Sequence, residues 1–540
     1  MTGLDVALSP LRFLDRSASV FPDKTAVIDG DRRVTYSELA RHVVRLAHAV
    51  RASGTAPGDR VAYLASNSAE LLAAHFAIPL AGNVLVAVNT RLAAPEIQYI
   101  CDHSGAKLLF AEGEQLQRIK LRRDDLATVA EIIELPDENG GDSHSWAATT
   151  YAQFLGRGAD EALPWEVDDE NATISINYTS GTTGRPKGVM YTHRGAYLNA
   201  LNQVVHNGFT ADTRYMWTLP MFHCNGWCHP WAVTAVAATH VCLRAVRADA
   251  MWRAIDDLAV THLSGAPTVL TTLTNAPQAH ELAHPLNITT AGAPPSPATI
   301  EAVRGLGATV THVYGLTETY GPYAICEVQP GWAGLSRGEI ATRLARQGVG
   351  MVCSDHMRVI RPSASDADTL VDVRADGSEM GEIVMRGNIV MKGYYLEPQQ
   401  TREAFAGGWF HSGDLGVRHS DGYVQLFDRA KDVIISGGEN ISSVEVEQAV
   451  MSHPAVVEVA VVGVPDDKWG ERPKAFVVAV KGVPVTADDI VDHVKTRLAS
   501  FKAPRDVQFV AELPKTSTGK TLKGELRVDQ QAKRAALLPS

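Results

Sequence analysis

Cysteine is scarce in this sequence, with 6 residues of this type among 540. So few cysteines in so long a chain do not form a disulfide framework, and their scarcity favours a reducing compartment. A surplus of basic residues is also absent, because the net charge is −11 at pH 7. This charge argues against a nucleic-acid partner, which usually meets a basic footprint. The first residues lack a basic region followed by an apolar core, so no secretory signal is evident and we expect a cytoplasmic protein.

Long apolar runs are missing as well. The longest apolar region, residues 71–88, is interrupted by His75, Pro79, Gly82 and Asn83. A membrane-spanning helix needs about 20 mostly apolar residues, so this region predicts a helix, a turn and a buried strand instead. We therefore expect no stable membrane insertion. A chain of 540 residues is long enough for about two to four folding units.

The chain does contain alternating helices and strands. Thr35 and Glu38 have the spacing of a capping box in front of an amphipathic helix. Apolar patterns predict further elements, namely strands over 61–64, 84–88 and 107–111 and a helix over 69–78. Strands that alternate with helices indicate an α/β fold with mostly parallel sheets flanked by helices.

The most informative stretch is residues 178–188. The alternating residues Ile174, Ile176 and Tyr178 predict a strand that leads into it, and a helical pattern follows it. Between strand and helix the chain gathers hydroxyl, glycine and lysine residues, namely Thr179, Ser180, Gly181, Thr182, Thr183, Gly184, Lys187 and Gly188. Glycines let backbone N–H groups approach closely, hydroxyls donate hydrogen bonds and lysine supplies charge, so this composition suits phosphate. A Walker A loop is excluded, because Pro186 stands where that motif needs its second glycine.

This stretch resembles the signature loop of the acyl-adenylate-forming superfamily, which comprises acyl-CoA synthetases, adenylation domains of peptide synthetases and firefly luciferases. Further motifs follow in the order of that family. The resemblance implies a large N-terminal domain with several subdomains and mostly parallel sheets over residues 1–428. A small, mobile α+β domain would span residues 432–540, and residues 429–431 would form the hinge.

A predicted strand over 216–220 leads to a second motif at residues 221–229, where two cysteines are flanked by two histidines. The spacing is too compressed for a zinc finger, and no second ligand pair stands at the required distance. The resemblance instead implies that His223 and nearby aromatic residues line the acyl pocket and gate the approach of a thiol. The sequence leaves open whether Trp217, Trp227 and Trp231 are core residues or pocket residues.

Two further segments resemble the adenine and phosphate sites of the family. A predicted strand leads to a turn that resembles the adenine-binding turn and consists of Gly292, Ala293 and Pro294. In the next motif Tyr314 would stack on adenine, Thr317 would contact the α-phosphate, and Glu318 would hold Mg²⁺. A Mg²⁺ ion that bridges phosphates needs only one or two carboxylates from the protein. Thr182 of the glycine-rich loop is the second expected metal ligand.

A later segment resembles the ribose site and the hinge of the family. Asp414 would accept both ribose hydroxyls, Arg429 would reach ribose and phosphate, and Lys431 would be the pivot. Gly437 and Gly438 would let pantetheine, the thin arm of coenzyme A, approach the chain closely.

The resemblance implies an ATP-dependent acid–CoA ligase that works in two steps and uses ATP, Mg²⁺ and coenzyme A. A carboxylate would attack ATP to give acyl-AMP and pyrophosphate, with Lys520 at the end of the last motif as the catalytic lysine. The thiol of coenzyme A would then expel AMP. The aromatic residues of the pocket favour a short- or medium-chain fatty acid, and an aryl or arylpropenoic acid is the close rival. An adenylating enzyme that serves a carrier protein, a luciferase-type oxygenase and a nucleotide sensor without turnover are less favoured. The sequence leaves open whether the protein forms a homodimer.

Overall fold

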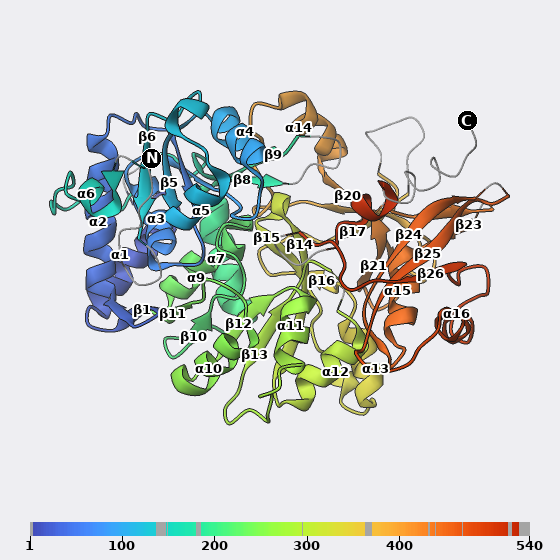
Figure 1. Cartoon of the computed structure of the whole chain (residues 1–540). Coiled ribbons are helices and arrows are strands. Elements are labelled where there is room, and N and C mark those ends of the chain that lie inside the picture. The colour runs from blue at the N-terminus through green and yellow to red at the C-terminus, as the bar shows by residue number, and fades with distance from the viewer. Residues whose placement is uncertain are drawn as a thin grey trace.

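Figure 1 shows the fold of a computed structural model, which describes residues 4–136, 147, 149–179, 185–293, 295–361, 370–429, 432–437, 439–466, 468–516 and 521–528. Its helices are α1 (Leu11–Val20), α2 (Tyr36–Ala52), α3 (Ala69–Leu80), α4 (Ala94–Ser104), α5 (Gly113–Ile119), α6 (Tyr151–Leu155), α7 (His193–Asn207), α8 (Cys224–Trp227), α9 (His229–Ala235), α10 (Ala248–Leu258), α11 (Pro267–Thr274), α12 (Pro297–Gly305), α13 (Arg337–Leu344), α14 (Pro398–Ala404), α15 (Ser443–Met451) and α16 (Ala487–Lys495). In the described part of the chain, no helix has the length and apolar character that crossing a membrane requires.

One large sheet has the strand order β19-β9-β8-β4-β3-β5-β6-β7. Its strands are β3 (Arg60–Leu64), β4 (Val84–Ala87), β5 (Ala106–Glu112), β6 (Glu131–Leu135), β7 (Thr149–Thr150), β8 (Thr173–Thr179), β9 (Lys187–Thr192) and β19 (Gly393–Tyr394). Neighbours from β8 to β7 are parallel, whereas β9 and β19 join antiparallel at one edge. The strands expected over 61–64, 84–88 and 107–111 are confirmed as β3, β4 and β5.

The second large sheet has the order β16-β15-β14-β13-β12-β10-β11-β1-β2. Its strands are β1 (Thr25–Asp29), β2 (Arg32–Thr35), β10 (Arg214–Met216), β11 (Thr239–Cys242), β12 (His262–Gly265), β13 (Asn287–Thr290), β14 (Thr309–Leu316), β15 (Gly321–Ile325) and β16 (Val349–Gly350). The strands from β14 to β1 are parallel, and the two ends of the sheet are antiparallel. The mostly parallel α/β architecture is thus confirmed.

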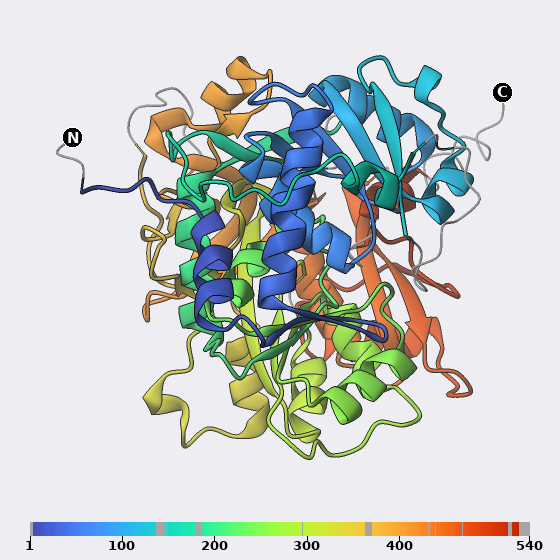
Figure 2. The same cartoon turned by 90° about the vertical axis from the view of Figure 1, so that its left-hand side faces the viewer.

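Buried helices lie between the two large sheets. Every residue of α3 after Ala69 is buried, which is the pattern of a helix that packs on all sides. The outer helices α1 and α2 lie side by side on one face of the molecule (Figures 1 and 2), and they pack against α9 and α3. The capping box in front of α2 is confirmed, because the Thr35 side chain accepts from the Glu38 backbone and Glu38 accepts from the Thr35 N–H.

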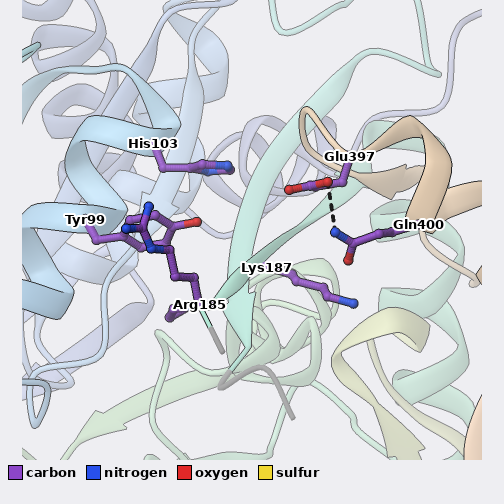
Figure 3. A pocket seen from close by; sticks show the side chains of 7 residues that line it. Tyr99, His103, Arg185, Lys187, Glu397 and Gln400 are labelled. Carbon is purple, nitrogen blue, oxygen red and sulfur yellow. Dashed lines mark hydrogen bonds between the residues drawn. The ribbon is translucent and has the colours of Figure 1, made fainter. Parts of the chain in front are cut away.

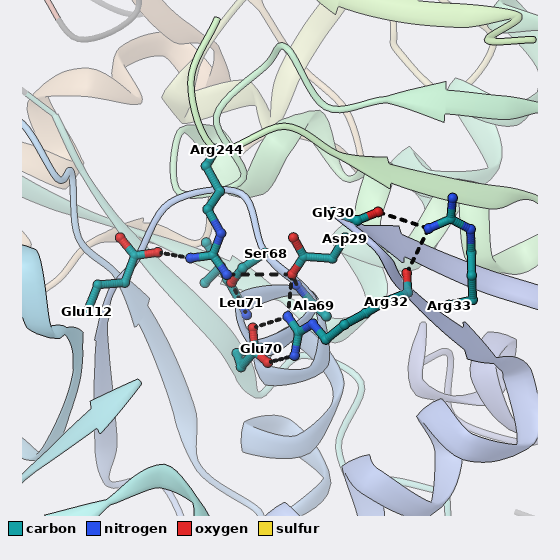
Figure 4. Close-up of polar contacts among 10 residues, drawn as sticks. All are labelled: Asp29, Gly30, Arg32, Arg33, Ser68, Ala69, Glu70, Leu71, Glu112 and Arg244. Atoms are coloured by element: carbon teal, nitrogen blue, oxygen red, sulfur yellow. Dashed lines mark hydrogen bonds and ion pairs between the residues drawn. The ribbon is translucent and has the colours of Figure 1, made fainter. Parts of the chain in front are cut away.

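An ion-pair cluster also links the two sheets (Figure 4). The Arg32 guanidinium on β2 pairs with Glu70 at 2.7 Å and with Asp29 on β1. Arg244, which follows β11, pairs with Glu112 on β5 at 2.8 Å and lies 3.6 Å from Asp29. The three carboxylates are buried, and a buried charge needs a partner to remain ionised at low cost. The cluster therefore fastens β5 of the first sheet to β1 of the second.

Two smaller sheets follow. The antiparallel sheet β17-β18-β20-β21 consists of β17 (Arg358–Ile360), β18 (Gly381–Met385), β20 (Phe410–Arg418) and β21 (Val424–Arg429). The C-terminal sheet β23-β22-β25-β24 consists of β22 (Ile434–Ser436), β23 (Glu439–Ile441), β24 (Val456–Asp466) and β25 (Gly470–Ala479), and β26 (Asp506–Phe509) pairs with β25. This sheet and the helices α15 and α16 form the orange and red part of Figure 1 and enclose a hydrophobic cluster of their own.

Two expectations about the large sheets are wrong in detail. The glycine-rich stretch does not lead from a strand directly to a helix, because β9 pairs antiparallel with β8 and α7 begins only at His193. The helical pattern expected after the stretch is confirmed as α7, and the short strand β9 before it has no clear pattern of its own. The strand expected over 216–220 ends at Met216, after which the chain is irregular.

Candidate active site

A buried carboxylate on β20 joins segments that are far apart in sequence. The hydroxyl of Tyr314 on β14 donates to Oδ2 of Asp414 at 2.7 Å. Arg429 on β21 places its Nε 3.3 Å from Oδ1 of the same carboxylate. Burial, followed by the charge of Asp414, raises the pKa of the Tyr314 hydroxyl, so Tyr314 remains a hydrogen-bond donor. A carboxylate offers about four lone-pair sites, so Asp414 can accept further hydroxyl donors while it holds Tyr314 and Arg429.

A second carboxylate follows β14 directly. Glu318 lies in a single 3₁₀ turn, Thr317–Thr319, and its Oε1 accepts from the hydroxyl of Tyr394 on β19 at 2.9 Å. The Met391 N–H donates to the Glu318 carbonyl at 2.7 Å and fixes its backbone. Packing around the side chain removes water and raises the pKa of Glu318 above its ordinary value. A nearby positive charge would stabilise the ionised form of such a buried carboxylate.

Lys187 approaches Glu318 through the same tyrosine. Its ammonium lies 5.0 Å above the Tyr394 ring, while the ring's hydroxyl holds Glu318. Thr179, the last residue of β8, pairs with Lys187, the first residue of β9. The residues expected between them to bind phosphate, namely Ser180, Gly181, Thr182, Thr183 and Gly184, lie outside the described residues. The two ends of the predicted loop are thus paired with each other, and Lys187 shares Tyr394 with the predicted metal ligand.

Aromatic stacking connects β9 to the Thr317 turn. The rings of Tyr191 and Tyr320 stack with centroids 3.9 Å apart. The hydroxyl of Tyr191 donates to the Thr317 carbonyl at 2.6 Å. The Thr192 N–H donates to the Tyr320 hydroxyl at 2.7 Å. A Cβ at Gly195 would overlap that hydroxyl, so the first turn of α7 requires a glycine there.

The aromatic motif lies on the other side of Thr317. His223 precedes α8, and its Nε2 is 3.5 Å from Sγ of Cys224, which in turn lies 3.3 Å from Oγ1 of Thr317. Of the three tryptophans left open above, Trp217 and Trp231 are fully buried core residues. Trp227 packs in a smaller cluster that includes Cys224, Ala291 and Val313, beside the predicted adenine and phosphate segments.

The predicted adenine turn follows β13 as expected. Gly292 has a φ of +91°, a conformation that glycine adopts without steric cost, and it is exposed together with Ala293. Pro294 lies outside the described residues. The exposed backbone of this turn lies at the carboxyl end of a parallel strand, where α/β sheets bind their ligands.

The predicted hinge and tail residues are described only in part. Gly437 has a φ of +62°, its N–H donates to the Trp469 carbonyl at 2.8 Å, and a Cβ there would lie 2.7 Å from the Trp469 ring. Lys431, Gly438 and Lys520 lie outside the described residues. Lys515 and Thr521 form an isolated antiparallel bridge, so the chain returns on itself on either side of the segment with Lys520.

Several site residues had no recognisable sequence signal. Tyr394 is the clearest case, because it reaches Glu318 only through the pairing of β19 with β9. A cavity of about 340 Å³ lies beside Lys187 (Figure 3), and no sequence pattern indicates it as a whole. It is lined by Tyr99, His103, Arg185, Pro186, Lys187, Glu397 and Gln400. Among the lining residues, Arg185 could have been predicted, because it is a basic residue next to the predicted phosphate loop.

Asp414, Glu318, Lys187 and the exposed turn at Gly292 come from three different sheets and form a candidate nucleotide-binding site. Comparison with known proteins supports this assignment. The family described as AMP-binding enzyme matches residues 14–395, and the family described as AMP-binding enzyme C-terminal domain matches residues 445–520. The chain belongs to the AMP-binding enzyme family.

Curated relatives cover nearly the whole chain. An acetate–CoA ligase of Humulus lupulus is 43% identical over 96% of this chain and 94% of its own length. A peroxisomal acetate/butyrate–CoA ligase of Arabidopsis thaliana is 42% identical over 96% and 94%. A peroxisomal trans-cinnamate:CoA ligase of Petunia hybrida is 39% identical over 97% and 94%. Among solved structures, the anthranilate CoA ligase in complex with anthranoyl-AMP superposes with a TM-score of 0.85 at 26% identity, covering 98% of this chain and 99% of that one.

Proposed function

We propose that this enzyme is an AMP-forming acid–CoA ligase that activates a short- or medium-chain carboxylic acid. The observation that carries the proposal is the convergence of Tyr314 and Arg429 on the buried carboxylate of Asp414, whose charge acts on Glu318. These residues come from separate segments, and each matches a motif of the AMP-binding enzymes. A sensor that binds nucleotide without turnover would not need a catalytic lysine such as Lys520.

In the first step an oxygen of the substrate carboxylate attacks the α-phosphorus of ATP, and the bond to pyrophosphate breaks. Two anions meet, so the barrier is mainly electrostatic, and preorganised donors lower it most effectively. We assign that role to Lys520, Thr317 and the hydroxyls of the predicted phosphate loop. His223 lies next to Cys224, which contacts Thr317, and we assign His223 to the acyl side of the site, where it would face the carboxylate.

We assign the metal to Glu318 and Thr182. The raised pKa of Glu318 fits a cation ligand, because a bound cation would offset the cost of its buried charge. Among the described residues no group of three or more His, Cys, Asp or Glu side chains could hold a metal by itself. A single carboxylate is enough for a Mg²⁺ ion whose other ligands are mainly water and oxygens of the nucleotide phosphates. When bound, Mg²⁺ neutralises phosphate charge.

In the second step the thiol of coenzyme A attacks the acyl carbonyl and expels AMP. We propose that residues 432–540 rotate about a hinge at 429–431, with Lys431 as pivot, against residues 1–428. The rotation would withdraw Lys520 and present Gly437 and Gly438 to pantetheine, as a hinge switch between two catalytic arrangements. The family match that ends at residue 520 supports a separate C-terminal domain.

Relatives named for acetate and butyrate support an aliphatic substrate. The aryl alternative is supported by the relative named for trans-cinnamate and by the anthranilate enzyme. A cytoplasmic location fits the free state of all six cysteines, although two of these relatives are named peroxisomal.

The deciding experiment measures pyrophosphate, AMP and CoA-thioester release with ATP, coenzyme A and a series of acids. The series contains linear acids from acetate to decanoate, benzoate and cinnamate. Thioester formation with acetate or butyrate is expected. Pyrophosphate release without a CoA thioester would favour a carrier-protein acceptor, and no turnover with any acid would contradict the proposal.

A further inference from the structure

The turn that carries Thr317 and Glu318 ends in a strained residue. Tyr320 closes this 3₁₀ turn, and its φ of +60° lies in the left-handed region. That region is unfavourable for a bulky residue, and such a conformation persists only where the surroundings hold it. Tyr191 and Thr192 on β9 hold the ring and the hydroxyl of Tyr320. Its backbone carbonyl needs a separate partner.

A side chain of α7 binds that carbonyl. The Nδ2 of Asn199 donates to the Tyr320 carbonyl at 3.0 Å, and Asn199 is fully buried. A buried amide is unfavourable unless its polar atoms are hydrogen-bonded, so its place in the middle of a helix requires a reason. Here the bond fixes the end of the turn, two residues after Glu318.

Asn199 is the last side chain in a relay of hydrogen bonds that all run in one direction. Thr289 on β13 donates from its hydroxyl to Oδ1 of Asn207 at 2.6 Å. The Nδ2 of Asn207 donates to Oε1 of Gln203 at 3.2 Å, and Nε2 of Gln203 donates to Oδ1 of Asn199 at 3.2 Å. The spacing of four residues puts the three amides on one side of α7. Hydrogen bonds in such a chain polarise and strengthen one another.

The relay connects two segments that carry predicted nucleotide ligands. At one end, β13 leads within two residues to the predicted adenine turn at Gly292. At the other end, the Tyr320 carbonyl follows the predicted α-phosphate and metal ligands, Thr317 and Glu318. Helix α7 therefore bonds the strand of the adenine turn to the turn at which the reaction takes place.

We propose that Asn199 is a positioning residue for adenylation and that the relay through Gln203 and Asn207 holds its amide in place. The inference rests on the proposed ligase function and adds a residue that acts through the Tyr320 carbonyl. That carbonyl fixes the turn, and the turn fixes the position of Thr317 against the α-phosphate. Displacement of reacting groups by about 1 Å can slow a reaction about 10²-fold.

This role affects kcat more than the affinity for ATP. Tyr314 and Asp414, which we assign to adenine and ribose, lie outside the relay and hold each other. Loss of the Asn199 amide leaves that pair intact and releases only the turn. A purely structural role would instead lower the stability of the fold without a selective effect on kcat.

The test replaces Asn199 with leucine, which has nearly the same size and forms no side-chain hydrogen bond. In N199L the kcat for pyrophosphate release with saturating butyrate should fall about 10- to 100-fold, and KM for ATP should stay near the wild-type value. In Q203L the loss should be smaller, because Asn199 still donates to Tyr320 but has lost its donor from the relay. Hydrogen exchange of residues 317–320, measured by mass spectrometry, should be faster in N199L than in the wild type.

A matched control removes a buried amide elsewhere. Asn83 is 3% exposed, and its Nδ2 donates to the Ala56 carbonyl at 2.8 Å. Asn83 precedes β4, at the edge of the sheet opposite the carboxyl end of β8, where the predicted phosphate loop begins. N83L should lower the melting temperature, as N199L does, but leave both kcat and the exchange of residues 317–320 unchanged.

The outcomes separate the inference from its alternatives. A kcat in N199L equal to that in N83L, or a loss that appears only as a higher KM for ATP, would overturn the positioning role. If melting curves show that N199L does not fold, Q203L decides by the same comparison. An unchanged Q203L beside an impaired N199L would overturn the relay. Failure of the ligase proposal is distinct, because the wild type would then release no pyrophosphate with any acid, and the exchange of residues 317–320 would still decide whether Asn199 holds the turn.

Discussion

The hydroxyl of Tyr394 donates a hydrogen bond of 2.9 Å to Glu318, a residue 76 positions away in sequence. The same ring faces Lys187 at 5.0 Å. One side chain at the edge of the first sheet therefore positions both the predicted metal ligand at the end of β14 and the lysine of the predicted phosphate loop. Tyr394 lies on the short strand β19 (Gly393–Tyr394), whose pairing with β9 holds the ring in place.

The variant Y394F should make the enzyme more sensitive to acid. Burial raises the pKa of Glu318, and the hydrogen bond from Tyr394 lowers it. Glu318 binds a cation only when ionised, so activity is present above this pKa and is lost as pH falls through it. Without the hydroxyl the pKa rises further, and the acid limb of the kcat/KM profile for ATP should move to higher pH. At neutral pH the loss should be about tenfold, as for one hydrogen bond.

The matched control for this change is Y395F. Tyr395 is the next residue, and its ring packs against His103 rather than Glu318. The acid limb of the kcat/KM profile of Y395F should coincide with that of the wild type. Added Mg²⁺ should restore the activity of Y394F and leave that of Y395F unchanged. An acid limb in Y394F at the wild-type position would show that the hydroxyl does not act on Glu318.

The variant D414N should weaken ATP binding. It removes the charge that holds Tyr314 and Arg429 and replaces one acceptor oxygen with a donor group. Hydrogen bonds to a charged partner are worth more than neutral ones, so KM for ATP should rise about ten- to hundredfold. Steady-state kinetics with ATP as the varied substrate measure this effect.

Asp421 supplies the control for D414N, because it lies at the turn of the same β20–β21 hairpin. Its ion pair with Arg346 is 2.9 Å long and its side chain is 43% exposed. D421N should leave KM for ATP unchanged, because the Asp421 carboxylate contacts Arg346 and the Tyr423 N–H and is not bonded to Tyr314 or Arg429. An equal rise in both variants would mean that the hairpin, and not the carboxylate of Asp414, determines ATP affinity.

The hairpin itself was predictable from sequence, whereas the partners of Glu318 and Asn225 were not. Asp421, Gly422 and Tyr423 are local turn signals, and they set the register that brings Arg429 opposite Asp414. By contrast, Tyr394 reaches Glu318 only through a long-range strand pairing. Such pairings depend on tertiary packing, which local patterns do not encode.

The same distinction explains the other differences between expectation and structure. Periodicity correctly indicated strands such as β3, β4 and β5, because buried parallel strands are continuous apolar runs. It missed β9, since six residues between a glycine-rich stretch and a helix carry a weak pattern. The left-handed turn at Asn225 had no local signal either, because hydrogen bonds from Ser175 and Asn177 hold it.

The variant R244M should destabilise the fold without altering the site. It leaves Glu112 without the ion pair of 2.8 Å that links the two large sheets. Breaking a buried pair by removing one partner costs about 3–5 kcal/mol. Denaturant unfolding should show this loss, whereas R253M should show none, because the Arg253–Asp249 pair is 69% and 66% exposed.

The deficit of R244M should also grow with pH. Burial raises the pKa of Glu112, and the charge of Arg244 opposes this rise. In the variant the folded-state pKa moves further above the unfolded value. A carboxyl group whose folded-state pKa lies above its unfolded value destabilises the fold as pH rises through the folded-state pKa. The difference in free energy of unfolding between R244M and the wild type should therefore be smallest in acid. A pH-independent difference would exclude Glu112 as the cause.

The variant K520A should separate the two half-reactions. Adenylation brings a carboxylate and ATP together, and losing one preorganised cation should slow it about 10²–10³-fold. Thiol attack on acyl-AMP needs no such cation, so thioester formation from supplied acyl-AMP and coenzyme A should proceed at nearly the wild-type rate. Lys515 lies in the same segment and pairs with Glu458 at 2.5 Å, so K515A should leave both half-reactions intact. If K520A slowed both half-reactions equally, one fixed arrangement would serve both steps, and the proposed rotation about Lys431 would be wrong.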